Sequence, residues 1–276
     1  MFLHERTILY PVADELRAAT GDTRTGIVLR SNYFSLESEG FPAAFPLVRK
    51  EHFAPVRFII PEEYLYLTQV TLETKSTIRS EIAAAIKDVF PESLSEIAWD
   101  FEILSEKEGQ TVIEISGVTK EFGELLTAAL SHSGLRLEAI IPESYALART
   151  LPFDEPVILI HKRDDRVILC LSRKQKVVST IILDHQPTPL EVREFIEFGK
   201  TRKGCAVEKI VLSGFGSEEE SLGVDDLPVS MLDTALDPIH GALLLDYSSR
   251  HDADRLDLPL RIRSGSWYQR VLNLFR

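Results

Sequence analysis

The stretch VILIHKRDDRVILC, residues 157–170, consists of two apolar, β-branched runs joined by a charged segment. The charged segment begins at His161 and ends at Arg166. Apolar runs of this length, separated by a few polar residues, predict a β-hairpin. A further apolar run follows it, so the sequence predicts three successive strands, at residues 157–161, 166–172 and 176–183.

A helix start signal stands directly after these strands, in TPLEVREFIEFGKTRKG, residues 188–204. Thr188 as the N-cap, Pro189 as the first helical residue and Glu191 as the third form a capping box. The following residues, VEKIVLSGFGS (207–217), indicate a buried strand and a glycine-rich loop. This order of helix, strand and glycine loop is typical of α/β proteins with a central sheet.

The first half of the chain has a mixed α and β pattern. In residues 76–90, isoleucines recur every four positions and Pro91 follows, which predicts an amphipathic helix and its end. Gly134 is placed to end a second helix. The other expected elements are strands at residues 26–36, 56–60, 64–72, 96–104, 110–118 and 135–141, and helices at residues 120–133 and 142–150.

The composition excludes several classes of protein. The 276 residues are 44% hydrophobic and 27% charged, enough for one large or two ordinary globular domains. A formal net charge of −12 argues against nucleic acid as a partner, because phosphate neutralisation needs a basic face. The two cysteines, Cys170 and Cys205, suggest neither a disulfide framework nor a metal site.

The opening MFLHERTILY carries Glu5 and Arg6 among its apolar residues, so it does not form the apolar core of a secretory signal. No window approaches the length of a transmembrane helix. We therefore expect a soluble, cytoplasmic chain.

Sequence motifs for catalysis are missing: there is no GxxxxGK[ST], HExxH, CxxC or GxSxG. His132 ends an expected helix, His161 ends an expected strand and His240 opens an apolar run, and all three are expected to be structural. The paired acids Asp164–Asp165 and Asp225–Asp226 could hold a divalent metal, but in so acidic a chain they are expected to be solvated turns.

Three segments carry a resemblance to a known family: IRSEIAAAIKDVFPESLSEIAWDFEIL (78–104), FGELLTAALSHSGLRLEAIIPESYALAR (122–149) and VEKIVLSGFGS (207–217). Their order resembles the bacterial actin-like family that includes the type IV pilus platform protein PilM and the division protein FtsA, and PilM most of all. The resemblance implies a reduced actin-like, ribonuclease-H-like α/β fold with an inserted small α+β subdomain of the SHS2 kind.

In that family two strand-turn-strand hairpins hold the nucleotide phosphates, each with Asp followed by Gly. Glycine lets backbone N–H groups approach the phosphates, and Asp holds the metal or its water. Aligned here, the first hairpin has Val28 and Arg30 at these positions, and the second has His161 and Arg163. Only the third loop keeps its glycines, Gly214 and Gly216. The resemblance thus implies a degenerate ATP site: a pseudo-ATPase without cofactor or metal.

The expected domain organisation follows from the same resemblance. A subdomain that the family inserts between Asp184 and Thr188 has no room here. The expected units are residues 1–55 and 136–247 for the actin-like core, 56–135 for the inserted subdomain, 248–264 for a polar linker and 265–276 for a C-terminal amphipathic helix.

That last segment, GSWYQRVLNLFR, has an apolar stripe at helical spacing with arginines beside it. It resembles the membrane-targeting tail of FtsA. Three roles stay open: contact with a membrane surface, packing on the protein's own core, or docking into a groove of another chain. The predicted contact residues are Trp267, Tyr268, Arg270, Val271, Leu272, Leu274 and Phe275.

The resemblance implies a non-catalytic scaffold, peripheral on the cytoplasmic face of the inner membrane. It would assemble a type IV pilus or type II secretion-like platform by binding a single-span inner-membrane component. The alternatives are an FtsA-like membrane tether for a division filament and an active, ATP-binding, polymerising actin-like protein. Homo-oligomerisation is left open.

Overall fold

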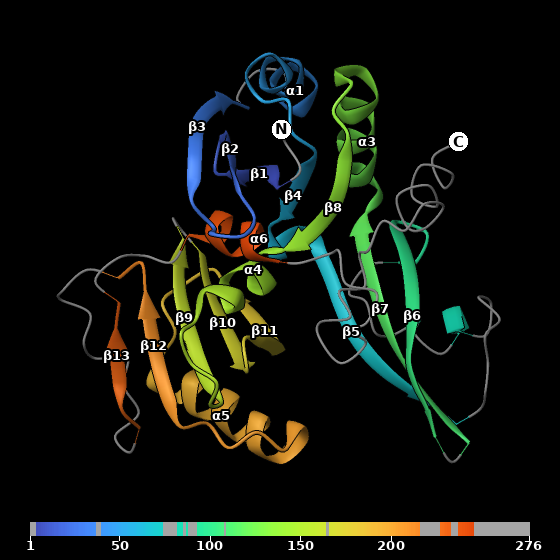
Figure 1. Ribbon diagram of the computed structural model, residues 1–276. Coiled ribbons are helices and arrows are strands. Elements are labelled where there is room, and N and C mark those ends of the chain that lie inside the picture. Colours follow the sequence, from blue (N-terminus) through green and yellow to red (C-terminus); the bar gives the residue numbers. More distant parts are fainter. Residues whose placement is uncertain are drawn as a thin grey trace.

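The computed structural model describes residues 4–36, 40–73, 82–84, 87, 93–107, 109–163, 166–215, 227–232 and 237–245. These residues form two lobes, each with a five-stranded sheet, and a three-stranded sheet that projects from the first lobe (Figure 1). The predictions for residues 164–165, 216, 225–226 and 246–276 fall outside the described residues. So does most of the helix expected at residues 76–90, of which residues 82–84 are helical.

The two five-stranded sheets have the same topology. The first has the order β3-β2-β1-β4-β8 and the second β11-β10-β9-β12-β13. In each, three strands form an antiparallel meander, and two more run parallel to the first strand of that meander. The strands of the first sheet are β1 (Glu5–Val12), β2 (Glu15–Asp22), β3 (Val28–Ser35), β4 (Val56–Ile60) and β8 (Leu137–Pro142). Those of the second are β9 (Val157–Arg163), β10 (Arg166–Arg173), β11 (Lys176–Leu183), β12 (Lys209–Ser213) and β13 (Val229–Met231).

The third sheet is inserted between β4 and β8 and has the order β5-β7-β6. Its strands are β5 (Leu65–Leu72), β6 (Ile97–Lys107) and β7 (Gln110–Thr119). The other elements are η1 (Glu62–Tyr64), α1 (Gly40–Glu51), α3 (Lys120–Ser133), α4 (Glu143–Thr150), α5 (Pro189–Lys203) and α6 (Pro238–Leu244). Because β4 pairs in the first sheet and α3 packs in the core with α1, the predicted boundary of the inserted subdomain at residues 56–135 is wrong at both ends.

Helix α4 joins the two lobes because both of its faces are apolar. Tyr145 and Ala146 pack on the first sheet, and Leu147, Ala148 and Leu151 pack on the second. Helix α6 lies against α4 so closely that a Cβ on Gly241 would stand 1.8 Å from the carbonyl oxygen of Ala146. Helix α4 therefore contributes side chains to the cores of both lobes.

The end of α6 is held by a buried arginine from the first sheet. Arg57 donates from Nη1 to the carbonyl oxygens of Ala242 and Leu245, both at 2.8 Å, and from Nε to Glu138 at 2.9 Å. Burial tends to raise the pKa of Glu138, but hydrogen bonds from Arg6 and Arg57 outweigh it and lower this pKa. A cation at the last carbonyls satisfies acceptors that a helix end leaves open.

Several predicted elements are confirmed. The hairpin of β9 and β10, the strands β11 and β12 and the helix α5 form where the sequence predicts them, and the capping box of Thr188 and Glu191 is present. Gly134 ends α3 in the left-handed conformation with φ 68°.

Strands β1 and β2 and helix α1 were not expected from the sequence. β1 contains Pro11, and α1 begins at a glycine and contains Pro46, so proline weakens the pattern of both elements. These elements form because their apolar side chains are buried in the core. Ile8 and Leu9 of β1 and Phe45 and Val48 of α1 are fully buried.

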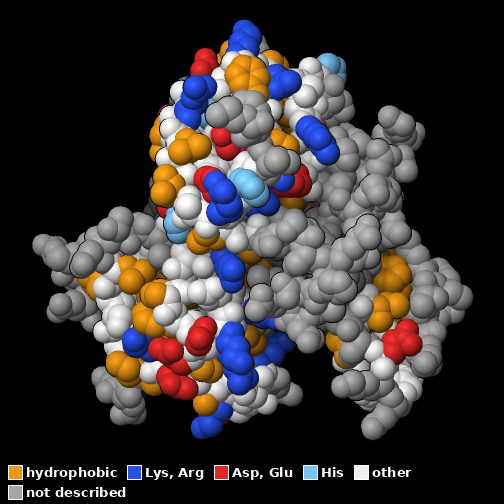
Figure 2. All heavy atoms as spheres, in the orientation of Figure 1, with side chains coloured by type: hydrophobic (Ala, Val, Ile, Leu, Met, Phe, Trp, Pro, Cys, Tyr) orange, Lys and Arg blue, Asp and Glu red, His pale blue; other side chains and the backbone are white. Residues whose placement is uncertain are grey.

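The surface of the first lobe carries apolar side chains along its outer strand. Leu29 and Tyr33 of β3 are 61% and 57% exposed. Figure 2 shows hydrophobic side chains along this edge of the lobe, with lysines and arginines beside them. Among the described residues, no helix has the length and apolar character needed to span a bilayer.

Candidate functional site

The candidate site lies where the two lobes meet. The parallel strands β1, β4 and β8 all end at the edge of the first sheet that faces the second lobe. Tyr10 lies near the end of β1, Glu62 and Glu63 follow β4, and Glu143 follows β8. The last residue of β9, Arg163, comes from the second lobe and completes the group.

Arg163 links both lobes through two ion pairs. Its Nη1 donates to Oε2 of Glu143 at 2.6 Å, and its Nη2 donates to Oε1 of Glu63 at 2.5 Å. The hydroxyl of Tyr10 donates to the other oxygen of Glu143. We call Tyr10, Glu62, Glu63, Glu143 and Arg163 the Arg163 cluster. Charge-assisted bonds of this kind are the stronger class of hydrogen bond.

Glu62 joins the cluster through the start of α4, where its Oε1 accepts a hydrogen bond of 2.8 Å from the backbone N–H of Ser144. The N-terminus of a helix favours a carboxylate, because its first N–H groups have no partner within the helix. Two buried atoms near this point, Oε2 of Glu63 and Oγ of Ser144, have no hydrogen-bond partner among the described residues.

The cluster is buried and holds more carboxyl groups than cations. The side chain of Glu143 is 0% exposed and that of Arg163 is 10% exposed. Burial raises the pKa of Glu143 to about 7 although Arg163 lowers it, and burial also raises the pKa of Glu62. For Tyr10, burial and the charge of Glu143 raise the pKa of the hydroxyl. One guanidinium thus stands among three carboxyl groups, so protonation of Glu143 lies within the physiological range.

A second contact holds the end of β9 to the end of β12. Nδ1 of His161 lies 3.1 Å from Oγ of Ser213, and burial, followed by the charge of Arg163, lowers the pKa of His161 to about 4. Gly214 has φ +80°, and a Cβ there would stand 2.4 Å from the carbonyl oxygen of Lys162. Backbone packing therefore requires glycine at position 214.

The placement of the first hairpin at Val28 and Arg30 is wrong. Both residues lie within the outer strand β3, where the Arg30 guanidinium donates to the carbonyl oxygen of Glu51 at 2.6 Å. The hairpin equivalent to β9–β10 is β1–β2, which turns at Ala13 with φ 49°. Because β1 and β2 were not predicted, the first phosphate hairpin of the family was aligned with a later part of the sequence than β1–β2.

The second placement falls at the hairpin of β9 and β10. His161 and Arg163 end β9 where it turns into β10, and Arg163 points into the meeting of the lobes through its ion pairs. The other histidines have local roles: Nδ1 of His132 lies 2.7 Å from the carbonyl oxygen of Ala128, and Nδ1 of His240 lies 3.0 Å from that of Gly26. Both cysteines are buried and free, and the described residues hold no group of three or more metal-ligating side chains.

The acids of the Arg163 cluster were missed in the sequence. A repeated signal marks them: IIPEE at residues 59–63 and IIPES at residues 140–144. In each copy a parallel strand ends at the proline or directly before it, and a short helix begins with glutamate. Since β4 and β8 are paired neighbours, the two copies come together at one sheet edge.

Comparison with known proteins supports the fold. No family model matches the sequence, and no curated protein matches it. Among solved structures, a chain of the PilM–PilN type IV pilus biogenesis complex is similar with a TM-score of 0.58 and 16% identity, over 83% of this chain and 90% of that chain. The cytoplasmic domain of EpsL, an inner-membrane component of the type II secretion system of Vibrio cholerae, gives 0.55 and 12%, over 88% and 96%.

A third structure, a protein of unknown function with an actin-like ATPase fold from Bacteroides thetaiotaomicron, gives a TM-score of 0.53 at 12% identity, over 88% of this chain and 96% of that chain. All three likenesses extend over most of both chains, and the repeated strand order of the two lobes agrees with them. The chain therefore has an actin-like fold, similar to those of these three structures.

Proposed function

We propose that the chain is a non-catalytic scaffold that assembles a type IV pilus or type II secretion-like platform at the cytoplasmic face of the inner membrane. The likeness in fold to a chain of the PilM–PilN complex and to the cytoplasmic domain of EpsL supports a role in such a platform. The Arg163 cluster is the main observation in favour of a non-catalytic role, because its ion pairs fill the interface between the two lobes.

The chemistry of the cluster disfavours Mg·ATP. Both carboxylate oxygens of Glu143 already accept hydrogen bonds, one from Tyr10 and one from Arg163, so this group is not available to the metal of Mg·ATP. Moving Arg163 onto a phosphate would leave Glu143 buried and unpaired, which is costly. Among the described residues, the one glycine at the expected loops is Gly214, and its open side is occupied by Lys162. The described residues do not fit the nucleotide.

The partner we propose is a single-span inner-membrane component of such a platform. The junction of the inserted sheet with the first lobe offers a contact surface, since Tyr64 is 40% exposed and Leu125 is 48% exposed there. The ring of Tyr64 stacks on Phe122 of α3 at 4.6 Å, so its position is fixed. We further propose that the C-terminal segment contacts the membrane surface, and that two weak contacts together give firm attachment.

A pull-down from detergent-solubilised native membranes tests this function. The tagged full-length chain and a version ending at Arg263 are compared, and the captured proteins are identified by mass spectrometry. We expect both versions to recover a small single-span pilus or secretion protein, because the docking surface lies in the folded body. Recovery of a tubulin-like filament protein, or of lipid alone that is lost on truncation, would instead support a division-type or general membrane tether.

A matched pair of surface variants locates the contact. Leu125→Asp on α3 should abolish capture, whereas Leu190→Asp on α5, which is 62% exposed in the wild type, should leave it unchanged. Equal capture by both variants would remove the junction as the docking surface. Circular dichroism of each variant confirms that it is folded.

A further inference from the structure

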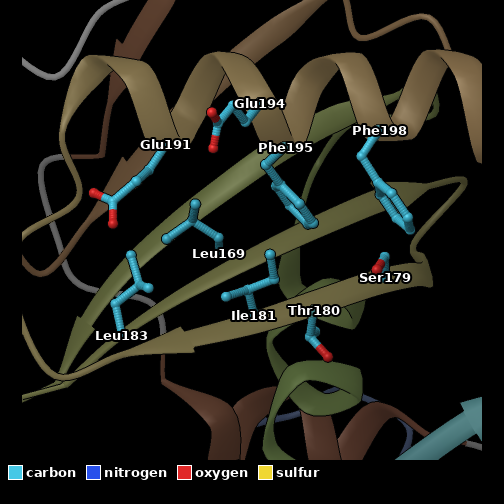
Figure 3. A pocket seen from close by; sticks show the side chains of 9 residues that line it. All are labelled: Leu169, Ser179, Thr180, Ile181, Leu183, Glu191, Glu194, Phe195 and Phe198. Carbon is cyan, nitrogen blue, oxygen red and sulfur yellow. The ribbon is translucent and has the colours of Figure 1, made fainter.

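A groove on the outer face of the second lobe is not explained by the proposed function. It lies between α5 and the outer strand β11 and encloses a cavity of about 530 Å³. Figure 3 shows Phe195 and Phe198 pointing from α5 towards the sheet, where Ile181 and Leu183 face them. Glu191 and Glu194 line the end of the groove nearest Leu183. We call this cavity the α5–β11 groove.

The first lobe shows how the corresponding position is filled. There α1, which also connects the third and fourth strands of its sheet, places Phe41 against the core cluster that includes Phe45 and Phe58. Phe34 of the outer strand β3 packs on the same cluster. In the second lobe, Ile181 remains 43% exposed and Phe198 remains 38% exposed. The groove thus leaves open an apolar surface that aromatic side chains cover in the first lobe.

The sequence contains a segment that matches this groove in chemistry. Residues 265–276, GSWYQRVLNLFR, carry six large apolar residues, three of them aromatic, and no acid. Arg270 and Arg276 are complementary to the acidic end of the groove. The charge of Glu191 is secure, since hydrogen bonds from Thr188 and His185 lower its pKa to about 2, and Glu194 has no ion-pair partner among the described residues.

The connection is long enough. The last residue that the structure describes is Leu245, at the end of α6. An extended chain spans about 3.3 Å per residue, so residues 246–266 can reach the outer face of the second lobe from there. A docking segment on such a tether has a local concentration in about the millimolar range, so even weak affinity keeps it bound.

We infer that residues 267–275 dock into the α5–β11 groove of their own chain. The docked segment covers Ile181 and Phe198 and withholds its apolar stripe from the membrane surface, so groove and membrane compete for it. This inference does not require the pilus or secretion role, and its test needs no membrane partner.

Disulfide trapping in the full-length chain tests the docking directly. The native cysteines, Cys170 and Cys205, are 0% and 4% exposed, so they can stay in place. The pair Ser179→Cys with Leu274→Cys should oxidise within one chain and run faster on a non-reducing gel. The control pair, Leu190→Cys with Leu274→Cys, should not, because Leu190 is exposed on α5 but does not line the groove. A covalent dimer, or no disulfide, overturns the inference.

Fluorescence of Trp267 gives an independent readout. The difference between the spectra of the wild type and Trp267→Phe isolates this residue from Trp99. We expect blue-shifted emission without lipid, a red shift in Ile181→Glu, and no change in Leu190→Glu. Emission typical of exposed tryptophan in the wild type, which shifts to the blue only when anionic phospholipid vesicles are added, overturns groove docking and leaves the membrane contact of the proposed function standing.

Discussion

The two lobes of this chain share one strand order but use it differently at the place where they meet. In the first lobe, β1 turns into β2 at Ala13, and the strand ends supply Tyr10, Glu63 and Glu143. In the second lobe, β9 ends in Arg163, which reaches across to these groups. A cleft between two such lobes can serve a ligand, and here side chains from both lobes fill it. A shared topology therefore does not carry a shared chemistry.

The lobes also differ in the helix that connects their third and fourth strands. α5 has a capping box and a proline at its start, whereas α1 begins at Gly40 and contains Pro46. Helix α1 is stabilised mainly by burial, since Ala44, Phe45 and Val48 lie in the core of the first lobe. Local sequence signals thus define α5, and tertiary packing defines α1.

The largest expected effect comes from removing the contribution of the second lobe to the cluster. Arg163→Ala leaves the buried Glu143 and the partly exposed Glu63 without a cation, and breaking a buried pair from one side costs about 3–5 kcal/mol. Urea unfolding followed by circular dichroism measures this loss. Arg173→Ala, at an exposed strand end, is the matched control and should cost less than about 0.5 kcal/mol.

A double variant shows whether that cost is due to unpaired charge. Arg163→Met together with Glu143→Gln removes both charges and should recover much of the stability lost in Arg163→Ala. If the double variant is no more stable than Arg163→Ala, the cluster is not held by this ion pair.

The next largest effect should come from the packing of α6 on α4, which both lobes share. Gly241→Ala places a Cβ 1.8 Å from the carbonyl oxygen of Ala146, so the helices must separate, at a cost of about 3 kcal/mol. Gly204→Ala, at the left-handed end of α5 with open space around it, should cost only about 1 kcal/mol. Thermal melts of both variants compare their losses of stability. Equal losses would contradict the tight contact between α6 and α4.

Glu143 and His161, on the two sides of the cleft, should contribute to the pH dependence of folding stability with opposite signs. The pKa of Glu143 is about 7 in the folded state and 4.5 as a reference, so the folded state holds more protons and stability falls as pH rises through this window. Glu62, whose pKa is also raised, has the same sign. The pKa of His161 is about 4 against a reference of 6.5, so its contribution falls as pH drops from 6.5 to 4.

Single variants separate these contributions. Glu143→Gln should weaken the loss of stability above pH 4.5, and His161→Asn should weaken the loss below pH 6.5. Unfolding free energies from urea titrations across this range give both slopes. Profiles parallel to that of the wild type would show that neither group titrates as the structure indicates.

The smallest effect tests the difference between α1 and α5. Thr188→Ala removes the side-chain oxygen that accepts from the backbone N–H of Glu191, and loss of such a cap costs about 1 kcal/mol. Thr201→Ala, on the same helix, is the control, and its hydroxyl bonds only to the carbonyl oxygen of Glu197. A fall in melting temperature for the first variant but not the second confirms that α5 depends on its cap.

The sequence predicts the second lobe better than the first for a physical reason. In the second lobe, β-branched runs, a charged hairpin and a capping box are local signals, so β9 to β12 and α5 are predicted. In the first lobe, Pro11 and Pro46 weaken the local pattern, and burial in the assembled core determines the structure. The hydrogen bonds of the Arg163 cluster join residues that are 20, 100 and 133 positions apart, so only the repeated Ile-Ile-Pro-Glu pattern at residues 59–62 and 140–143 indicates it.

Titration of the full-length chain with Mg·ATP, by calorimetry and by thermal melting, tests the central claim most directly. If the Arg163 cluster has replaced a nucleotide site, millimolar Mg·ATP gives no saturable heat and no rise in melting temperature, in the wild type and in Gly214→Ala alike. Saturable binding in the wild type that is weakened in Gly214→Ala would show that the cleft opens to nucleotide, and would contradict the account.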